Sequence, residues 1–574
     1  MRRLKQSRTV ALATPEATQV GMQRAIYPRP QLRRDSFFSL DGQWEFSAHP
    51  KGAPPTLDGR IRVPFPPESA LSGIDRVFAD GTELHYRRRF SLPVGFLRER
   101  VILHVGAADQ RAEVFLNGHS LGTHEGGYLP FSFDITRHLR AGENTLYIRV
   151  TDELDKHILP WGKQKHKRGG MWYTPVSGIW QSVWLESVPE RYVRALDIKA
   201  NGTGAVICAE GVDEGMVIVT TPEGLTCEKL KNGVAHISLH APRLWSPEDP
   251  YLYQFKLICG ADTVHSYFAC RTLSVGKVRG VPRLLLNGKP YFFHGLLDQG
   301  YFPDGIFTPA HPSRFEKDIL AAKALGFNTL RKHIKIEPEQ FYYDCDRLGM
   351  IVFQDMVNNG HYSFLRDTAL PTLGFKRRSD RRLHRDAATR AAFLAAMEQT
   401  VTALANHPSV CYWTIFNEGW GQFDSTAAFE KLRALDGTRF IDTASGWFTP
   451  SQSDVDSPHV YFKPVKCRPL QRPMVLSEFG GYSLAVKDHI FNPDRVYGYR
   501  KFTDEKAFQT ALLALYEDEI LPAVRAGLSG AIYTQLTDVE DEINGLFTYD
   551  RKHCKVNADA MRALAAKLMA ATLE

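Results

Sequence analysis

Two short apolar segments of the chain end abruptly in a glutamate. Residues 413–418 read WTIFNE and residues 473–478 read PMVLSE. Apolar runs of this length are typical of buried strands, and parallel barrels bury their strands on both faces. A charged side chain at the C-terminal tip of such a strand lies where (β/α)8 barrels carry their chemistry. We therefore predict that Glu418 and Glu478 face each other across the mouth of a barrel.

A facing pair of carboxylates can break a glycosidic bond. When the carboxyl groups lie about 5–5.5 Å apart, one attacks the anomeric carbon and the other shuttles the proton. The alternative interpretation places each glutamate in a structural ion pair at a strand end. Asn417, directly before Glu418, favours the catalytic interpretation, because its amide can donate to a sugar 2-hydroxyl.

Further polar and aromatic residues stand at or near predicted strand ends. Arg331 and His333 are two apart on one predicted strand, so their side chains point the same way. An arginine beside a nucleophilic carboxylate keeps it ionised by lowering its pKa. For each of these residues the alternative is a structural role in an ion pair, a cap or the core. The remaining candidates for substrate contacts are Tyr461, His459, Asp298, Asp355, Trp420 and Trp447.

The elements that would position these residues follow one another from about residue 286. Eight strands alternating with helices predict a (β/α)8, or TIM, barrel. A long loop at 357–386, after the third strand, is expected to form a wall of the site. The predicted strands are 291–297, 328–334, 350–356, 411–418, 439–445, 459–462, 474–478 and 530–537, and the predicted helices are 313–325, 338–348, 387–406, 424–435, 505–526 and 557–572.

The residues before the barrel read as all-β. Short alternating runs separated by turn residues predict a β-sandwich at 35–190, and an immunoglobulin-like sandwich at 191–276. The barrel then occupies 277–574, and residues 1–34 form a tail that we expect to be partly loose.

Bulk composition narrows the class of protein. At 574 residues the chain is too long for one core, and its 43% hydrophobic and 24% charged content is that of a globular protein. No segment approaches the ~18 apolar residues of a membrane helix or a secretory leader, which predicts a cytoplasmic protein with no membrane partner. The eight cysteines show no CxxC or CxxH spacing, which favours reduced thiols over zinc. A net charge of +7 is mild and does not imply nucleic acid.

Residues 35 to 574 resemble glycoside hydrolase family 2, the family of β-galactosidases, β-glucuronidases and β-mannosidases. The resemblance implies a retaining, exo-acting β-glycosidase with a jelly-roll domain, an immunoglobulin-like domain and a catalytic TIM barrel. It places the acid/base on Glu418 and the nucleophile on Glu478. The motifs that carry it are FLNG (115–118), EGGY (125–128), SGIWQSVWLE (177–186), WSPEDPYLY (245–253), LNGKP (286–290), GFNTLRKH (326–333), FNE (416–418) and SEFG (477–480).

Departures from the family pattern bear on the substrate. β-Glucuronidases hold the substrate carboxylate with an Asn-x-Lys motif just before a Gly-Ile/Leu-Phe-Thr sequence. Here Glu542-Ile543-Asn544 precedes GLFT at 545–548, so the lysine is absent and an acidic residue would repel a uronate. A neutral β-galactoside is therefore the leading prediction. The metal dependence of the large β-galactosidases is not carried over, and no cofactor or metal is predicted.

Two basic runs keep other interpretations open. The run at 376–385 would let a β-uronidase recognise its acidic sugar, or forms a solvated face. The run at 156–168, which contains Trp161, either extends toward the active site or binds an anion, although a plain exposed loop is the preferred interpretation. A non-catalytic carbohydrate-binding protein is the alternative from another class. A carbohydrate is the expected partner in every case, and formation of a homo-oligomer is left open.

Overall fold

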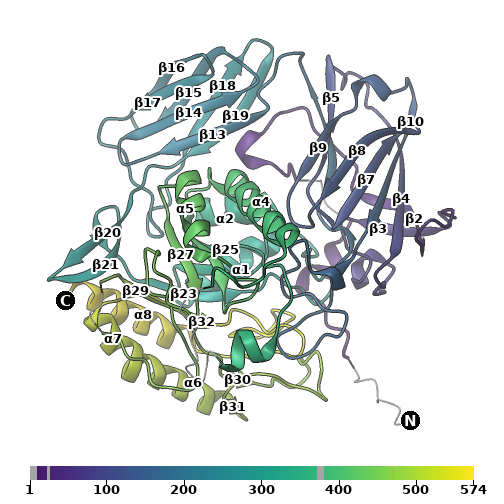
Figure 1. The fold of residues 1–574 in the computed structure, drawn as a ribbon. Helices are drawn as coiled ribbons and strands as arrows, with labels where there is room; N and C mark the ends of the chain where they lie inside the picture. The colour runs from purple at the N-terminus through teal and green to yellow at the C-terminus, as the bar shows by residue number, and fades with distance from the viewer. Residues whose placement is uncertain (1–8, 22–25, 371–379, 469–470) are drawn as a thin grey trace, which may run out of the picture.

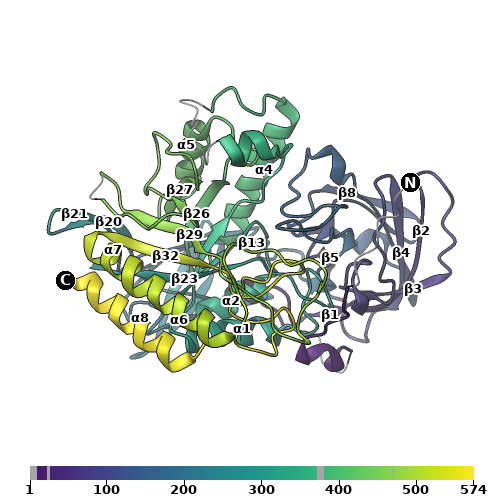
Figure 2. The same cartoon turned by 90° about the horizontal axis from the view of Figure 1, so that it is seen from below.

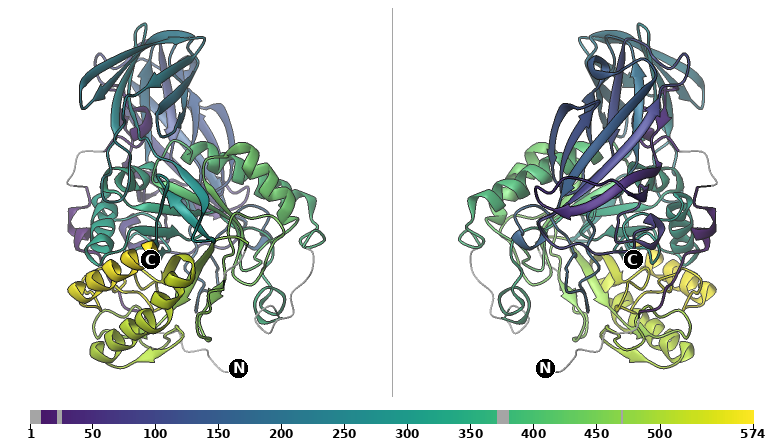
Figure 3. Two further views of the ribbon diagram at one scale, coloured as in Figure 1. Left: turned by 90° about the vertical axis from the view of Figure 1, so that its left-hand side faces the viewer. Right: turned by 90° about the vertical axis from the view of Figure 1, so that its right-hand side faces the viewer.

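The computed structural model describes residues 9–21, 26–370, 380–468 and 471–574. Three units follow one another along the chain (Figure 1). A β-sandwich lies on the right, a second all-β unit lies at the top, and a barrel fills the centre and lower left. Figure 3 shows the second unit standing above the barrel in both side views.

The first unit is a sandwich of two antiparallel sheets. Alternate residues of its strand β10 (Glu143–Thr151) are buried, as expected for a strand that packs one face against a second sheet. The predicted jelly-roll-type sandwich is therefore confirmed. One sheet has the order β1 (Phe38–Ser39), β12 (Val183–Val188), β5 (Arg100–Val105), β9 (Phe131–Asp134). The other has the order β3 (Gly59–Val63), β2 (Gly42–Pro50), β4 (Thr82–Ser91), β10 (Glu143–Thr151), β7 (Arg111–Leu116), β8 (His119–Glu125). A short pair, β6 (Ala108–Asp109) and β11 (Gly178–Ile179), lies beside them.

The second unit has the strand division of an immunoglobulin-like sandwich. Its seven strands divide into a group of three and a group of four, and strands pair within each group. The two groups are joined by the single pair Lys231↔Val234. Buried side chains from both groups form one core, which confirms the predicted fold. The first group is β13 (Ala195–Ala200), β14 (Gly204–Glu210) and β17 (Val234–Ser238), and the second is β16 (Gly224–Lys231), β15 (Glu214–Thr221), β18 (Tyr253–Cys259) and β19 (Asp262–Phe268).

The third unit is a parallel barrel of eight strands. The hydrogen-bonded order runs β27-β26-β25-β24-β23-β32-β29-β28, and the Gly446 amide closes the circle by donating to the Ser457 carbonyl at 2.8 Å. Every predicted strand is present within a few residues. The strands are β23 (Phe293–Asp298), β24 (Thr329–Lys332), β25 (Ile351–Asp355), β26 (Val410–Asn417), β27 (Phe440–Ser445), β28 (His459–Val460), β29 (Met474–Gly480) and β32 (Leu528–Thr534).

Helices cover the outside of the barrel (Figure 2). The predicted helix at 505–526 is present as α6 (Glu505–Leu515) and α7 (Leu521–Ala526) with a π-helical turn at Tyr516–Ile520 between them. The long loop after β25 contains another π-helical turn, Phe364–Ala369, and its residues 371–379 lie outside the described ranges. The other helices are α1 (Ser313–Ala324), α2 (Glu339–Leu348), α4 (Ala387–Leu404), α5 (Ser425–Leu435) and α8 (Ala558–Leu573). Short strands also join the units or edge the barrel: β20 (Leu273–Val278), β21 (Val281–Leu286), β22 (Lys289–Pro290), β30 (Ser483–Leu484) and β31 (Lys501–Phe502).

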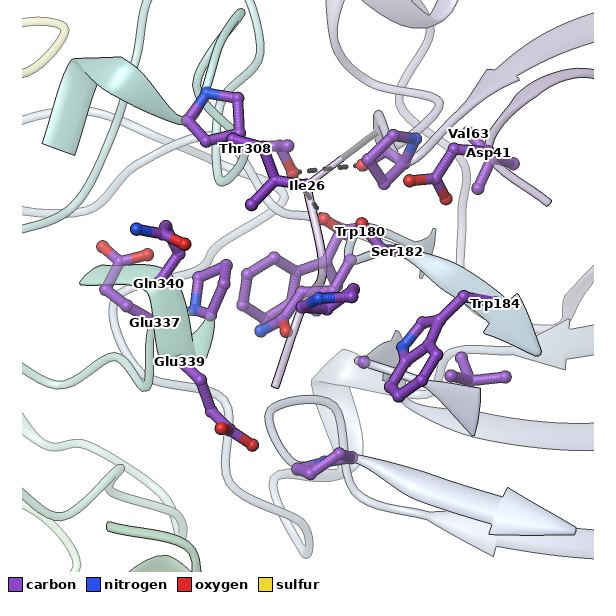
Figure 4. A pocket seen from close by; sticks show the side chains of 18 of the residues that line it. Ile26, Asp41, Val63, Trp180, Ser182, Trp184, Thr308, Glu337, Glu339 and Gln340 are labelled. Atoms are coloured by element: carbon purple, nitrogen blue, oxygen red, sulfur yellow. Dashed lines mark hydrogen bonds between the residues drawn. The ribbon is translucent and has the colours of Figure 1, made fainter. Parts of the chain in front are cut away.

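The first unit and the barrel share one hydrophobic core. Trp180 of the sandwich packs edge-on against Phe307 of the barrel with ring centroids 5.1 Å apart. A cavity of about 590 Å³ lies beside this contact. Figure 4 shows it with Asp41 and Trp184 on one side and the acidic start of α2 on the other. Neither Glu418 nor Glu478 lines this cavity, so it is separate from the candidate site.

The described part of the N-terminal tail is packed against the domains. The Thr14 amide and hydroxyl both donate to Asp304, at 2.8 and 2.6 Å. The Arg34 guanidinium pairs with Asp262 at 2.8 Å, and Leu32 joins the core of the second unit. The described residues of the tail are therefore held to the domains by polar and apolar groups at three separate places. Residues 1–8 and 22–25 lie outside the described ranges.

Two other sequence expectations concern side chains and membranes. All eight cysteines are free thiols, and Cys345 and Cys411 are buried, as predicted. Among the described helices, none combines the length and apolar character needed to cross a bilayer.

Candidate active site

The structure brings Glu418 and Glu478 together at the C-terminal end of the barrel. Glu418 follows the last residue of β26, and Glu478 lies in β29 directly opposite His459 of β28. One oxygen of each carboxylate and one nitrogen of His459 all lie within 4.8 Å of one another. The two glutamates are only 8% and 5% exposed. Their separation is that of the short carboxylate pair in retaining glycosidases.

Glu418 is held in an unusual backbone conformation. Its φ is +50°, in the left-handed region that a non-glycine residue seldom adopts. Its Oε1 lies 2.8 Å from Nδ1 of His459, which fixes the carboxylate on the side that faces Glu478. Strained backbone of this kind is concentrated at functional sites.

Glu478 is surrounded by groups that keep it ionised. Arg331 Nη1 donates to its Oε1 at 3.0 Å, and the Tyr461 hydroxyl donates to its Oε2. Burial acts to raise the pKa of Glu478, whereas His459 and the Arg331 guanidinium act to lower it, and the net result is a pKa of about 2. The carboxylate is therefore charged near neutral pH.

Arg331 links the residues around this carboxylate. Its fully buried guanidinium donates to Asp355 Oδ1 at 3.0 Å, to Asn417 Oδ1 at 2.8 Å and to the Ser445 hydroxyl at 3.0 Å. A planar fork with several donors orients its partners as well as neutralising them.

The Asn417 amide is oriented by this arrangement. Its Oδ1 accepts from Arg331 and from the Ser445 hydroxyl, at 2.8 and 2.9 Å. Its buried Nδ2 has no hydrogen-bond partner within the described ranges. A buried donor without a partner is costly, so this NH2 group is available to a substrate hydroxyl.

His333 and Asp355 form a supporting pair. His333 Nδ1 lies 2.7 Å from Asp355 Oδ2, and burial, followed by the charge of Lys163, lowers the pKa of His333 to about 4. Both oxygens of Asp355 are thus engaged, one by His333 and one by Arg331. Asp355 positions two site residues, whereas sequence analysis placed it in contact with a sugar hydroxyl.

Asp298 is not brought to the carboxylate pair. It shares its face of the barrel wall with Lys332, whose Nζ donates to Asp298 Oδ2 at 2.6 Å. The other oxygen accepts from the Gly300 amide at 2.9 Å. The period-2 alternation of strands puts Arg331 inside the barrel and Lys332 outside it. Asp298 pairs with Lys332 in the sheet and therefore also points outside.

The two tryptophans singled out from the sequence lie at the site. The Trp420 ring is 6.2 Å from that of His333, and the Trp447 ring meets His459 edge-on at 5.7 Å. Within the described ranges, both buried indole N–H groups lack a hydrogen-bond partner. Each therefore places an unpaired donor at the site.

The first unit contributes to the site through the segment that contains the first basic run, which was the less favoured of the interpretations drawn from the sequence. Residues 157–176 reach the barrel mouth, where the Trp161 indole donates to the Gly360 carbonyl at 3.1 Å and Trp172 packs on Trp420 at 5.2 Å. Lys163 is 7% exposed. The preferred interpretation of a plain exposed loop is therefore wrong for this part of the run. The signal available was the aromatic content of the segment, because a solvated basic loop has no need of Trp161, Trp172 and Tyr173.

The same segment binds the loop after β32. Tyr173 donates its hydroxyl to Glu542, whose other oxygen accepts from Asn544 Nδ2 at 3.0 Å. The Thr174 amide donates to Glu540 at 2.9 Å. Glu542, which was expected to repel a uronate, thus has both oxygens hydrogen-bonded.

Two tyrosines from loops complete the surroundings. Tyr499 stacks on Tyr461 with ring centroids 4.0 Å apart, and Tyr362 meets Trp420 edge-on at 5.7 Å. The second basic run lies partly outside the described ranges, at 376–379. In its described part Asp380 accepts from the Gln422 amide at 2.7 Å and supports the start of α5.

In the described part of the chain, two clusters have donor atoms close enough together to hold a metal ion. One is Glu418, His459 and Glu478, and the other is Asp80, Asp155 and His166 near the surface. A direct contact already joins two members of each cluster, at 2.8 Å in both cases. The geometry of neither cluster requires an ion.

A TIM barrel with a buried pair of glutamates on strands four and seven, preceded by two β-sandwiches, defines the architecture of a carbohydrate-hydrolysing enzyme. Comparisons with known families agree. The model for "Glycosyl hydrolases family 2, TIM barrel domain" matches residues 277–562, "Glycosyl hydrolase 2 galactose-binding domain-like" matches 74–175, and "Glycosyl hydrolases family 2" matches 197–271. The chain belongs to glycosyl hydrolase family 2.

Individual relatives carry two different names. A β-galactosidase of Thermoanaerobacter pseudethanolicus is 27% identical over 295 residues, which cover 47% of this chain and 39% of that protein. A β-glucuronidase of Chlorocebus aethiops is 27% identical over 495 residues, which cover 74% of this chain and 70% of that protein. The solved β-D-glucuronidase of Dictyoglomus thermophilum superimposes with a TM-score of 0.72 at 21% identity, covering 94% of this chain and 99% of that one. The chain spans about two fifths of the length of the β-galactosidases that it matches.

Proposed function

We propose that the protein is a retaining exo-β-glycosidase. The observation that carries the proposal is the short separation of the Glu418 and Glu478 carboxylates, together with the arginine and tyrosine that hold Glu478 as an anion. A pair with room for a water between its members would instead invert the anomeric centre. The jelly-roll segment that closes one side of the barrel mouth supports action on a terminal sugar.

The reaction proceeds in two displacements. In the first, a Glu478 oxygen forms a bond to C1 while the bond from C1 to the leaving oxygen breaks and that oxygen takes the proton of Glu418. In the second, Glu418 removes a proton from water, whose oxygen bonds to C1 as the bond from C1 to Glu478 breaks. Arg331 and Tyr461 stabilise the Glu478 carboxylate before attack and after release, and Asn417 donates to the 2-hydroxyl.

We place β-uronides ahead of β-galactosides as substrates, which reverses the order given by the sequence alone. The relatives whose length this chain matches best are named β-glucuronidases, whereas the β-galactosidases are much longer proteins. The argument against a uronate was the charge of Glu542. That carboxylate is bound by Tyr173 and Asn544 and so is partly withdrawn from a substrate. A neutral β-galactoside is the second candidate, because proteins of that name are also among the relatives.

Initial rates on a panel of p-nitrophenyl glycosides test this proposal. The panel holds the β-glucuronide, β-galacturonide, β-galactoside, β-glucoside, β-mannoside and α-arabinopyranoside, each assayed with the wild type and with Glu478→Gln. We expect hydrolysis of at least one β-glycoside by the wild type and loss of that activity in the variant. Equal rates for the two proteins would contradict the role of Glu478. No hydrolysis of any member would contradict the proposal and favour a carbohydrate-binding protein.

A further inference from the structure

Lys163 occupies an uncommon environment for a lysine. It belongs to the jelly-roll segment 157–176, yet its ammonium lies over barrel and loop aromatics. Nζ is 5.5 Å from the ring centroid of Trp420 and 5.7 Å from that of Tyr173. Gln164, the next residue, points the other way and donates to Asp109 inside the sandwich at 2.9 Å. Lys163 lies in a turn in which the Gln164 amide donates to the Trp161 carbonyl at 3.4 Å, and the turn directs its side chain at the barrel mouth.

The Lys163 side chain is largely buried, and its ammonium has no acidic partner. The residue is 7% exposed, and across the described ranges its ammonium forms no hydrogen bond or ion pair. Charged groups in largely buried surroundings are usually paired, because lost hydration is otherwise not compensated. Contact with aromatic faces offsets part of that cost. Lys163 is thus a cation without a protein counter-ion at the barrel mouth.

The nearby acids are occupied by other donors. Glu542 binds Tyr173 and Asn544, and Glu540 accepts from the Thr174 amide. Asp541 pairs with Arg168 at 3.0 Å and accepts from the Asn492 amide at 2.7 Å. None of the three is within ion-pair distance of Lys163, so the acidic loop after β32 does not neutralise it.

Lys163 lies one aromatic ring away from His333 of the candidate active site. Trp420 follows the acid/base Glu418 by two residues. Its ring contacts both the Lys163 ammonium and the His333 ring. After burial, the charge of Lys163 is the largest influence on the pKa of His333, and it lowers that pKa. His333 leads through Asp355 and Arg331 to the nucleophile Glu478. Lys163 is therefore next to the residues that border the reacting sugar.

We propose that Lys163 binds the carboxylate of a terminal uronic acid, and that the jelly-roll domain thereby supplies the charge recognition that the barrel loop lacks. The inference rests on the proposed glycosidase activity and names its substrate class. A uronate provides the missing counter-ion, and burial strengthens the charge-assisted hydrogen bond. A neutral hexoside leaves the ammonium unpaired, so the same lysine selects against it.

The test compares the Lys163→Met variant with the wild type on matched substrates. Methionine keeps the length and apolar stem of lysine and removes the charge. The substrates are p-nitrophenyl β-glucuronide and β-glucoside, and p-nitrophenyl β-galacturonide and β-galactoside, which differ within each pair only at C6. Lys163→Arg retains a charge, and Lys167→Met removes an exposed charge from the same run as a matched control.

We expect Lys163→Met to lower kcat/KM on the preferred uronide by about 10- to 100-fold, the value of one charged hydrogen bond, and to leave or raise kcat/KM on its neutral partner. Lys163→Arg should recover part of the uronide rate, and Lys167→Met should behave as wild type. Equal losses on both members of a pair, or an unchanged uronide rate, would overturn the role of Lys163. Wild-type activity on neutral sugars alone would also overturn it while leaving the glycosidase proposal standing, and inactivity on all four would count against both.

Discussion

His459 lies between the two carboxylates of the site, with Nδ1 2.8 Å from Glu418 Oε1 and Nε2 3.6 Å from Glu478 Oε1. One imidazole therefore contacts both the proton donor and the nucleophile of the proposed reaction. After burial, its charge is the largest influence on the pKa of Glu478, and it lowers that pKa. The two carboxylates are thus electrostatically linked through one side chain as well as facing each other.

Replacing His459 should move the acid limb of activity. Glu478 has a depressed pKa of about 2, so its charge, and the stability that this charge confers, is present above the ordinary value of 4.5 and is lost as the pH falls through about 2. His459→Gln removes one of the lowering influences, so the pKa of Glu478 rises. We expect the acid limb of the kcat/KM profile to shift to higher pH. His236→Gln, at an exposed position of the second unit, should leave the profile unchanged, and an unshifted limb in His459→Gln would contradict the assignment.

The roles of the two glutamates can be separated with azide. Glu478→Ala removes the nucleophile and leaves space behind it, so azide that enters this space attacks C1 directly and yields the α-glycosyl azide. Glu418→Ala removes the acid/base, which contributes about 10²–10⁴-fold. With an activated aryl leaving group the covalent intermediate still forms, and azide then yields the β-glycosyl azide. The anomeric configuration of each product is read by NMR. The opposite pairing of variant and anomer would show that the roles are exchanged.

Asn417→Ala tests the free amide donor. We expect kcat/KM on a substrate with a 2-hydroxyl to fall by about 10²–10³-fold, because that hydrogen bond strengthens in the transition state. On the 2-deoxy analogue the loss should be much smaller, since the bond is absent in both proteins. The hydrogen bond between Arg331 and Ser445 does not involve Asn417 and should persist in the variant. Equal losses on the two substrates would mean that Asn417 acts through folding or position alone.

Trp161→Ala probes the docking of the jelly-roll segment on the barrel. The indole is 1% exposed and donates to the Gly360 carbonyl, so its removal leaves a cavity and an unpaired acceptor at an interdomain contact. We expect a loss of about 3–5 kcal/mol in the free energy of unfolding, measured by urea denaturation. Trp161→Phe, which keeps most of the ring and loses only the donor, should cost less. A wild-type midpoint for Trp161→Ala would show that the segment is not docked in solution.

The sequence was informative wherever chemistry follows from strand position. The tips of β26 and β29, and the two-residue spacing of Arg331 and His333, were enough to predict that Glu418, Glu478 and Arg331 meet. The same rule failed for Asp298, because a strand end has two faces and only the register with Lys332 decides which face it takes. The position of a residue at a strand end identifies it as a candidate, and the register of the strand decides whether its side chain points into the barrel.

Contacts between domains were not accessible from the sequence. Lys163 and Trp172 lie about 250 residues from Glu418 along the chain, and nothing in local periodicity encodes which loop of a sandwich meets a barrel mouth. Tyr499 and Tyr362 come from loops whose path is set by tertiary packing. The composition of segment 157–176, basic and aromatic at once, was the only local sign that it is buried.

The central claim is that Glu478 forms a covalent bond to the sugar. Its most direct test is mass spectrometry of the protein after incubation with the 2-deoxy-2-fluoro-β-glycosyl fluoride of the sugar that the panel selects, because the fluorine slows the second displacement and lets the intermediate accumulate. We expect one added glycosyl group, located on the peptide that contains Glu478. A label on Glu418 or on any other residue, or no label from a protein that hydrolyses the parent sugar, would contradict it.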